Sequence, residues 1–284
     1  MPVVKATVHG AISIVNAIAT GKGATLGISK NIDVIIETSQ GHGITTETNG
    51  KLLRSRLINR VVEKIVPKKE LQKTKLKILL DSEVPTGYGL KSSSAISSAV
   101  ALGCAKLFKP NMNDFEILSA GVDASIETKV SLTGAYDDAC ACYYGGFNTT
   151  DNYKRKIIHS EKCLDDISAV IFLPYSRKRG NIKKLRTQSD IFEQAWNLAK
   201  KSDYWNAMIL NGFATSALLN SDPKIISKLV EKGALGASVS GNGPSIAAVA
   251  KNNNLTDIKK VFSTLEGTTT ISKINNKKAE VHEL

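Results

Sequence analysis

The sequence predicts an α+β fold, because strand patterns and helix patterns are mixed along it without regular alternation. Val3–Val15 and Thr25–Thr38 alternate apolar and polar residues, as strands with one buried face do. Helical periodicity runs through Leu52–Val66, which Pro67 ends, and the Ala-rich Ser92–Phe108 is a second helix. The absence of repeating βαβ units argues against a doubly wound parallel sheet.

The other elements follow from the same criteria. A strand at Leu76–Leu80 precedes the loop Pro85–Leu90, and a helix over Asp114–Glu127 has Asp114 as its expected N-cap. After this helix and Gly145-Gly146 we expect strands at Lys154–His159 and Ser168–Leu173, one or two helices in Asp190–Asn220, a helix at Pro223–Lys232, a strand and glycine loop at Gly236–Ala250, a helix at Thr256–Leu265 and a strand at Lys273–Val281. The 284 residues suit about two domains, which we expect at 1–152 and 153–284.

Composition and charge exclude several classes of protein. A hydrophobic content of 42% and a charged content of 23% are those of an ordinary globular chain. No apolar run approaches the roughly 18 residues of a membrane span, and residues 1–5 do not begin a signal peptide. The net charge of +12 would suit nucleic acid, but basic and acidic residues are mixed and no nucleic-acid motif is present. We therefore expect no nucleic-acid partner, and a basic surface that attracts anionic ligands.

Cysteines and histidines give no sign of a metal site. The four cysteines form no CxxC pair, and mostly apolar contexts predict buried free thiols in a reducing, cytoplasmic compartment: Cys104, Cys140, Cys142 and Cys163. The four histidines share no ligand spacing: His9, His42, His159 and His282.

The most informative segment is the loop Pro85-Thr86-Gly87-Tyr88-Gly89-Leu90-Lys91-Ser92-Ser93-Ser94-Ala95. Its glycines let the backbone approach an anion, and the start of the following helix favours negative charge. It is neither a Walker A loop nor a dinucleotide fingerprint, because the required glycines and hydroxyls do not fall at their positions. A glycine turn with a serine cap would explain it without a ligand, but three serines entering an Ala-rich helix favour a triphosphate site.

This loop resembles the central motif P-x-x-x-G-L-G-S-S-A-A of the GHMP kinases, the family of galactokinase, homoserine kinase and mevalonate kinase. Lys91 in place of the usual small residue, with the third serine, resembles the archaeal shikimate kinase branch. Three further stretches agree with the family in order along the whole chain: Asn16–Ala24, Gly134-Ala135-Tyr136-Asp137-Asp138-Ala139 before Gly145-Gly146, and Ser240-Gly241-Asn242-Gly243-Pro244-Ser245.

The resemblance implies a two-lobed GHMP kinase fold with an S5-like N-terminal domain and a ferredoxin-like C-terminal domain. It also implies ATP and Mg²⁺ as cofactors and shikimate as the small-molecule substrate. The reaction would yield shikimate 3-phosphate, a step toward chorismate and the aromatic amino acids. A kinase of the homoserine or mevalonate type is one alternative. A basic nucleic-acid-binding protein with an S5-like fold is another.

The resemblance also assigns roles to residues. Asp138 takes the position of the catalytic aspartate, with Asp137 assisting it or capping the following helix; capping would explain both acids without the family. Ser93 and Glu127 fall on metal-ligand positions. The nucleotide would contact Pro85–Ala95 and Gly241-Asn242-Gly243, and the substrate would contact four residues of the N-terminal loop: Asn16, Thr20, Gly21 and Lys22.

One departure from the family concerns charge. Many relatives carry a basic residue after the glycine of the first strand motif, but here Ala11 follows Gly10. We therefore expect Lys22 or Lys91 to supply the positive charge that assists phosphoryl transfer.

Overall fold

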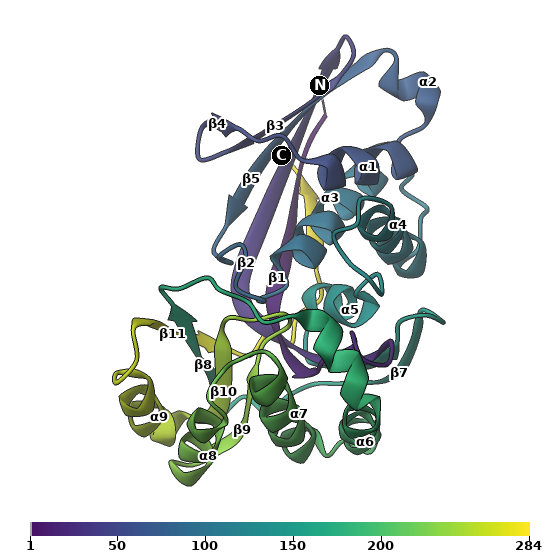
Figure 1. Ribbon diagram of the computed structural model, residues 1–284. Helices are drawn as coiled ribbons and strands as arrows, with labels where there is room; N and C mark the ends of the chain where they lie inside the picture. Colours follow the sequence, from purple (N-terminus) through teal and green to yellow (C-terminus); the bar gives the residue numbers. More distant parts are fainter. Residues whose placement is uncertain (1) are drawn as a thin grey trace.

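The computed structural model describes residues 2–284 as two sheets with helices packed against them (Figure 1). The strands are β1 (Val3–Val15), β2 (Lys22–Gln40), β3 (Ile44–Thr48), β4 (Lys51–Leu52), β5 (Thr74–Ser82), β6 (Phe147–Asp151), β7 (Lys156–Glu161), β8 (Ile167–Pro174), β9 (Ala234–Val239), β10 (Ile246–Lys251), β11 (Gly267–Lys273) and β12 (Glu280–Glu283). The helices are α1 (Arg56–Ile65), α2 (Lys68–Leu71), α3 (Ser92–Phe108), α4 (Asp114–Glu127), α5 (Tyr136–Tyr144), α6 (Ser189–Ala199), α7 (Tyr204–Leu218), α8 (Pro223–Glu231) and α9 (Leu255–Phe262), with 3-10 turns η1 (Ile182–Gln188) and η2 (Asn252–Asn254).

The larger sheet has the order β12-β1-β2-β5-β3-β4, and β6 adds to β2 with β7 beyond it. Strand β2 pairs with β1 along most of its length, but it changes partner on its other edge. Residues 22–26 pair with β6 and residues 32–40 pair with β5. The chain that leaves β5 crosses the sheet at this change of partner, where the carbonyl of Leu90 accepts a hydrogen bond from Ala11 N (3.5 Å).

Helices α1, α3, α4 and α5 pack together over one face of the larger sheet (Figure 1). The small side chains of α3 let it lie close to β1 and β2, and most of its residues are buried. This packing fixes the N-terminus of α3, which follows the phosphate loop predicted from the sequence.

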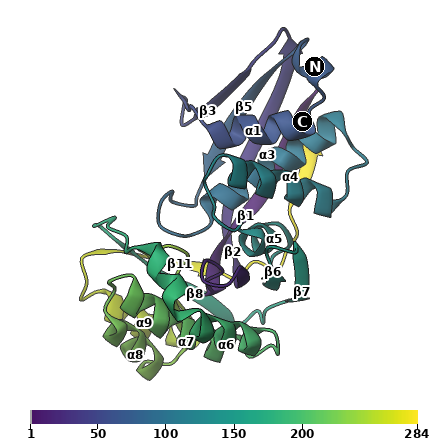
Figure 2. The same cartoon turned by 45° about the vertical axis from the view of Figure 1, so that its right-hand side comes forward.

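The smaller sheet has the order β11-β8-β10-β9 and is antiparallel throughout. Figure 2 shows this sheet with α6–α9 at one end of the molecule, away from α1–α4. Its core contains the stacked rings of Phe172 and Phe262, whose centroids are 5.3 Å apart.

The structure confirms the predicted α+β class, and its differences from the predicted elements have local causes. The helix predicted from Leu52 begins at Arg56, because the Ser55 hydroxyl caps it by accepting from Ile58 N. Asp114 was predicted as the N-cap of α4, but Asn113 is the cap and forms a capping box with Glu116.

The C-terminal strand prediction was also wrong in its extent. The predicted strand Lys273–Val281 is divided into β11 and β12, and the segment between them bonds to β2 through Asn275 N and Gly27 O (3.0 Å). Because β7 and β12 both belong to the larger sheet, sheet membership crosses the expected boundary at 152/153. The division into two domains stays a prediction.

Two further expectations concern the whole chain. The four cysteines are buried free thiols, as expected. Over residues 2–284 we find no helix with both the length and the apolar character needed to cross a membrane.

Candidate active site

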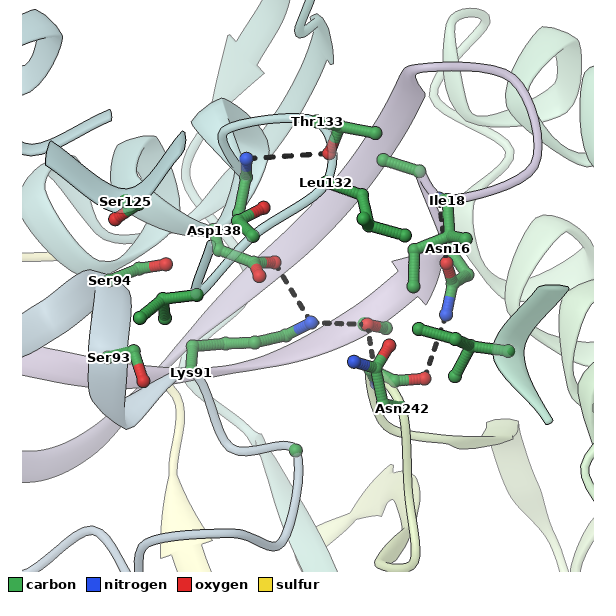
Figure 3. A pocket seen from close by; sticks show the side chains of 18 of the residues that line it. Asn16, Ile18, Lys91, Ser93, Ser94, Ser125, Leu132, Thr133, Asp138 and Asn242 are labelled. Atoms are coloured by element: carbon green, nitrogen blue, oxygen red, sulfur yellow. Dashed lines mark hydrogen bonds and ion pairs between the residues drawn. The ribbon is translucent and has the colours of Figure 1, made fainter. Parts of the chain in front are cut away.

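A cavity of about 450 Å³ lies where the predicted motifs converge (Figure 3). Its walls come from the loop after β5, the first turn of α3, the loop before α5, the first turn of α5 and the loop between β9 and β10. Segments from both sheets therefore contribute to one cavity.

The two glycine-rich loops hold each other in place. Ser240 Oγ donates to the carbonyl of Gly89 (2.8 Å), and Ser245 Oγ donates to the carbonyl of Tyr88 (2.6 Å). Gly89 has φ +84°, and a Cβ there would lie 2.0 Å from the Ser240 carbonyl oxygen. Only glycine permits this approach, so the close packing of the loops explains the second glycine of the motif.

Lys91 connects the three motifs around the cavity. It precedes α3 in the left-handed conformation (φ +66°), and only 6% of its side chain is exposed. Its Nζ lies 2.9 Å from Asp138 Oδ1 (Figure 3) and donates to Ser13 Oγ (2.7 Å). Ser13 Oγ also accepts from Gly241 N (2.9 Å), so one ammonium group links the phosphate loop, α5 and the C-terminal glycine loop.

The start of α3 is suited to an anion. Its first turn contains no acidic residue, and no side chain caps it, so its N–H groups and dipole are available to a ligand. Ser93 and Ser94 lie at the cavity from this turn (Figure 3). Lys91, Lys129 and Arg179 add positive charge around the same space. This set of donors fits a polyphosphate.

Asp137 and Asp138 lie in the first turn of α5, but neither is its N-cap. Ala135 holds the N-cap position in the left-handed conformation without a side-chain bond, so the capping role considered for Asp137 is wrong. Asp137 is buried and accepts a hydrogen bond from Asn152 Nδ2 (2.7 Å). Burial raises the pKa of Asp137, and the neighbouring charge of Asp138 raises it further.

Most of the residues expected to bind ligands lie at the cavity. They are Asn16, Thr86, Gly87, Gly89, Lys91, Ser92, Ser93, Ser94, Asp137, Asp138, Gly241, Asn242 and Gly243. Four residues of the predicted nucleotide loop do not line it: Pro85, Tyr88, Leu90 and Ala95. Leu90 and Ala95 are buried in the core, so they support the loop from behind.

The N-terminal loop divides between cavity and surface. Asn16 lines the cavity and donates from Nδ2 to the carbonyl of Gly241 (2.8 Å). Lys22 points elsewhere, because its Nζ pairs with Glu193 (2.5 Å) and lies over the ring of Trp196. Thr20 and Gly21 are also absent from the cavity wall formed by the described residues. Of the two lysines considered for the missing charge, the structure brings only Lys91 to the acids.

Glu127 also lies apart from the cavity. Its carboxylate receives hydrogen bonds from Lys64 (2.6 Å) and Arg60, and these bonds lower the pKa of Glu127. Within residues 2–284 there is no cluster of three or more histidine, cysteine, aspartate or glutamate side chains that would hold a metal ion. A metal at this site would therefore depend on few protein ligands.

Several residues of the site carry no recognisable sequence motif. Ser13 and Thr133 are ordinary hydroxyl residues in the sequence, and Arg179 belongs to a basic run between β8 and α6. Thr25 and Asn152 support Asp137 from outside the cavity. One signal was available for Asn152, because it ends the polar run 148–152, which is unusual for a buried strand.

Comparison with known proteins gives consistent relatives. Residues 56–146 match the family described as GHMP kinases N terminal domain. The chain is 34% identical over 277 residues to a shikimate kinase of Methanobrevibacter smithii, covering 94% of this chain and 95% of that protein. It is 36% identical over 278 residues to a shikimate kinase of Methanosarcina mazei, covering 95% and 94%. The solved mevalonate kinase of Methanococcus jannaschii has a TM-score of 0.76 at 17% identity, covering 96% and 98%, which is a likeness of fold.

Proposed function

Because the chain belongs to the GHMP kinases, in the family of the archaeal shikimate kinases, we propose that it phosphorylates shikimate with ATP. The γ-phosphoryl group passes to the 3-hydroxyl and gives shikimate 3-phosphate, a precursor of chorismate and the aromatic amino acids. The buried free thiols support a reducing, cytoplasmic compartment for this reaction.

The observation that carries the proposal is the ion pair between Lys91 and Asp138 at the start of α3 (Figure 3). An anion-binding helix terminus and a carboxylate suited to a hydroxyl group meet at one cavity. Phosphoryl transfer requires this combination, because the protein mainly positions the reactants and neutralises charge.

The nucleotide phosphates would lie against Gly87–Ser94, with Gly241–Gly243 closing the opposite side. N–H groups and hydroxyls of the α3 terminus, together with Lys91 and Arg179, offset the negative charge of the phosphates. These groups are fixed before the ligand arrives, so they need little reorganisation during the reaction.

Asp138 would orient the substrate hydroxyl and accept its proton. Lys91 holds the Asp138 carboxylate at the cavity, and it also supplies the positive charge that Ala11 does not. Lys22 remains outside this arrangement because of its pairing with Glu193.

The metal-ligand positions fit Mg²⁺ only in part. Ser93 lies at the cavity and would hold a Mg²⁺ ion that arrives with the nucleotide. Mg²⁺ bound there would neutralise phosphate charge. Glu127 does not fit as placed, since Arg60 and Lys64 occupy its carboxylate.

A substrate panel tests the proposal. ADP release is measured by a coupled assay with shikimate, homoserine and mevalonate, and Asp138→Asn serves as the control for contaminating kinases. We expect turnover with shikimate that the control lacks. Turnover only with homoserine or mevalonate would end the shikimate assignment, and salt-sensitive RNA binding without ATP turnover would favour a nucleic-acid-binding protein.

A further inference from the structure

Thr25 lies between the two acids of the site on their buried side. Its Oγ1 is 3.1 Å from Asp137 Oδ2 and 3.3 Å from Asp138 Oδ1, and its side chain is fully buried in β2. Asp137 is 3% exposed. One hydroxyl group therefore joins the proposed catalytic carboxylate to a second, buried carboxyl group.

The contacts of Asp138 distinguish its two oxygens. Lys91 Nζ and Thr25 Oγ1 both meet Oδ1. Among residues 2–284, no side-chain donor meets Oδ2. Because Asp138 lines the cavity, Oδ2 is the oxygen left for the substrate hydroxyl.

The number of hydrogen-bond donors among Thr25, Asp137 and Asp138 limits how their protons can be placed. Thr25 has one O–H, so it donates to only one of the two acids. Its contact with the other acid is favourable only when that acid is protonated and donates to Oγ1. The geometry thus suits one neutral and one charged carboxyl group.

Asp137 is the more deeply buried of the two acids, and burial suits its neutral form. Asn152 Oδ1 accepts from the backbone N–H of Asp137 (3.0 Å) and from Thr150 Oγ1 (2.6 Å). This fixes the Asn152 amide so that Nδ2 donates to Asp137 Oδ1 (2.7 Å). The other oxygen of Asp137, Oδ2, faces Thr25 Oγ1, and a Cβ at Gly23 would lie 2.2 Å from it, so glycine at position 23 leaves it room.

The charged and titratable neighbours of Asp137 are few. Asp138 and the thiols of Cys140 and Cys142 share helix α5, and Lys91 faces it from the start of α3. Its hydrogen-bond partners from strand β2 and the β6–β7 turn, Thr25 and Asn152, are uncharged. Burial raises the pKa of Asp137 to about 6, and the charge of Asp138 adds to this, while Lys91 and the hydrogen bonds from Asn152 and Thr25 oppose it.

We propose that Asp137 and Thr25 are positioning residues, an inference that rests on the proposed function. Neutral Asp137 donates through Oδ2 to Thr25 Oγ1, and Thr25 donates to Oδ1 of Asp138. The substrate O–H bond breaks with its proton passing to Oδ2 of Asp138. The substrate oxygen forms its bond to the γ-phosphorus, and the bond from that phosphorus to the oxygen of ADP breaks.

Four variants separate this positioning role from a merely structural one. Thr25→Val keeps the shape but removes the hydroxyl, and we expect kcat to fall about 10- to 100-fold, as for a lost hydrogen bond to a charged group, with little change in KM. Thr25→Ser should recover most of this loss. Asp137→Asn reproduces the neutral pattern of one donor and one acceptor, so it should exceed Asp137→Ala in kcat by about ten-fold or more. Wild-type kcat in Thr25→Val, or equal losses in Asp137→Asn and Asp137→Ala, would overturn the proposal.

Two measurements are independent of turnover. At about pH 5, below the raised pKa of about 6 of Asp137, infrared spectroscopy should detect a neutral carboxylic acid in the wild type that is absent from Asp137→Asn. An acid with a raised pKa in the folded state stabilises the fold fully below its unfolded pKa, and this stability is lost as pH rises through the folded pKa. The wild-type Tm should therefore fall relative to that of Asp137→Asn as pH rises from about 4. A missing carboxylic acid band or parallel Tm profiles would contradict a neutral Asp137, whereas loss of shikimate turnover in every protein would contradict only the proposed function.

Discussion

Replacing Lys91 by Met removes the ammonium group at the centre of the site and keeps most of its apolar stem. Lys91 Nζ is 2.9 Å from Asp138 Oδ1, and the two side chains are 6% and 16% exposed. At an effective dielectric constant of about 20, this distance gives an attraction of about 6 kcal/mol, much of which desolvation offsets. Removing one partner of a buried pair costs about 3–5 kcal/mol. Asp138 borders a cavity and keeps its bond from Thr25, so we expect the lower end, about 3 kcal/mol.

Lys91→Gly removes the same ammonium and also the buried apolar stem that Met keeps, while it relaxes the backbone. A left-handed conformation costs a non-glycine residue about 1–2 kcal/mol, and the greater chain entropy of glycine offsets part of this gain. The relieved strain offsets only part of the lost burial of the stem, at about 0.8 kcal/mol per CH₂ group, so Lys91→Gly should be less stable than Lys91→Met. Activity should not follow stability, since both variants lack the charge. We expect kcat to fall about 10²- to 10³-fold in each.

The measurements are urea unfolding for stability and coupled ADP release with shikimate for activity, both at one pH and ionic strength. A kcat within about three-fold of the wild type in either variant would show that the ammonium does not assist the reaction. A Lys91→Gly protein as stable as Lys91→Met would show that the strain of the left-handed conformation at position 91 is as large as the burial free energy of the stem.

Three further substitutions test other parts of the site. Asp138→Asn should lower kcat about 10²- to 10⁴-fold with an unchanged circular dichroism spectrum, and near-normal turnover would refute its role. Gly89→Ala should lower Tm and raise the KM for ATP, because its Cβ would meet the Ser240 carbonyl. Gly50→Ala is the control for backbone strain alone, because Gly50 has a similar φ of +70° but no atom lies within 4 Å of a Cβ there. Glu127→Gln should change the Mg²⁺ concentration for half-maximal activity by less than about two-fold, and a ten-fold increase would restore Glu127 as a metal ligand.

The sequence predicted the fold class and the elements with strong patterns. Strand β1 and helices α3 and α4 have the bounds that were expected, because each has a long pattern and Pro110 follows the end of α3. Helix α5 was not predicted as an element, since its nine residues are too few and too mixed to show an apolar stripe. Strand β12 was not resolved from β11, because its four residues gain their partner only when the chain returns to β1.

Site residues could be predicted where a local sequence motif carries its own chemistry. Residues whose position depends on packing between distant segments could not. The glycine and serine pattern placed the phosphate loop correctly at the cavity. Nothing local showed that Lys22 would pair with Glu193, which follows it by 171 residues. The support of Asp137 by Thr25 and Asn152 also depends on three separate segments meeting in the fold.

The absence of a basic residue at position 11 is explained by the way β1 meets the phosphate loop. Ala11 is fully buried, and its N–H bonds to the carbonyl of Leu90, the residue before Lys91. Positions 11 and 91 are therefore neighbours in space although 80 residues separate them in the sequence. The ammonium group of Lys91 therefore reaches the cavity that a basic side chain near position 11 would otherwise reach. It donates a hydrogen bond to the hydroxyl of Ser13, two residues after Ala11 on β1. The charge is thus kept in the same part of the site and is supplied by the β5–α3 connection instead of by β1, so the departure at Ala11 and the lysine at 91 are two parts of one arrangement.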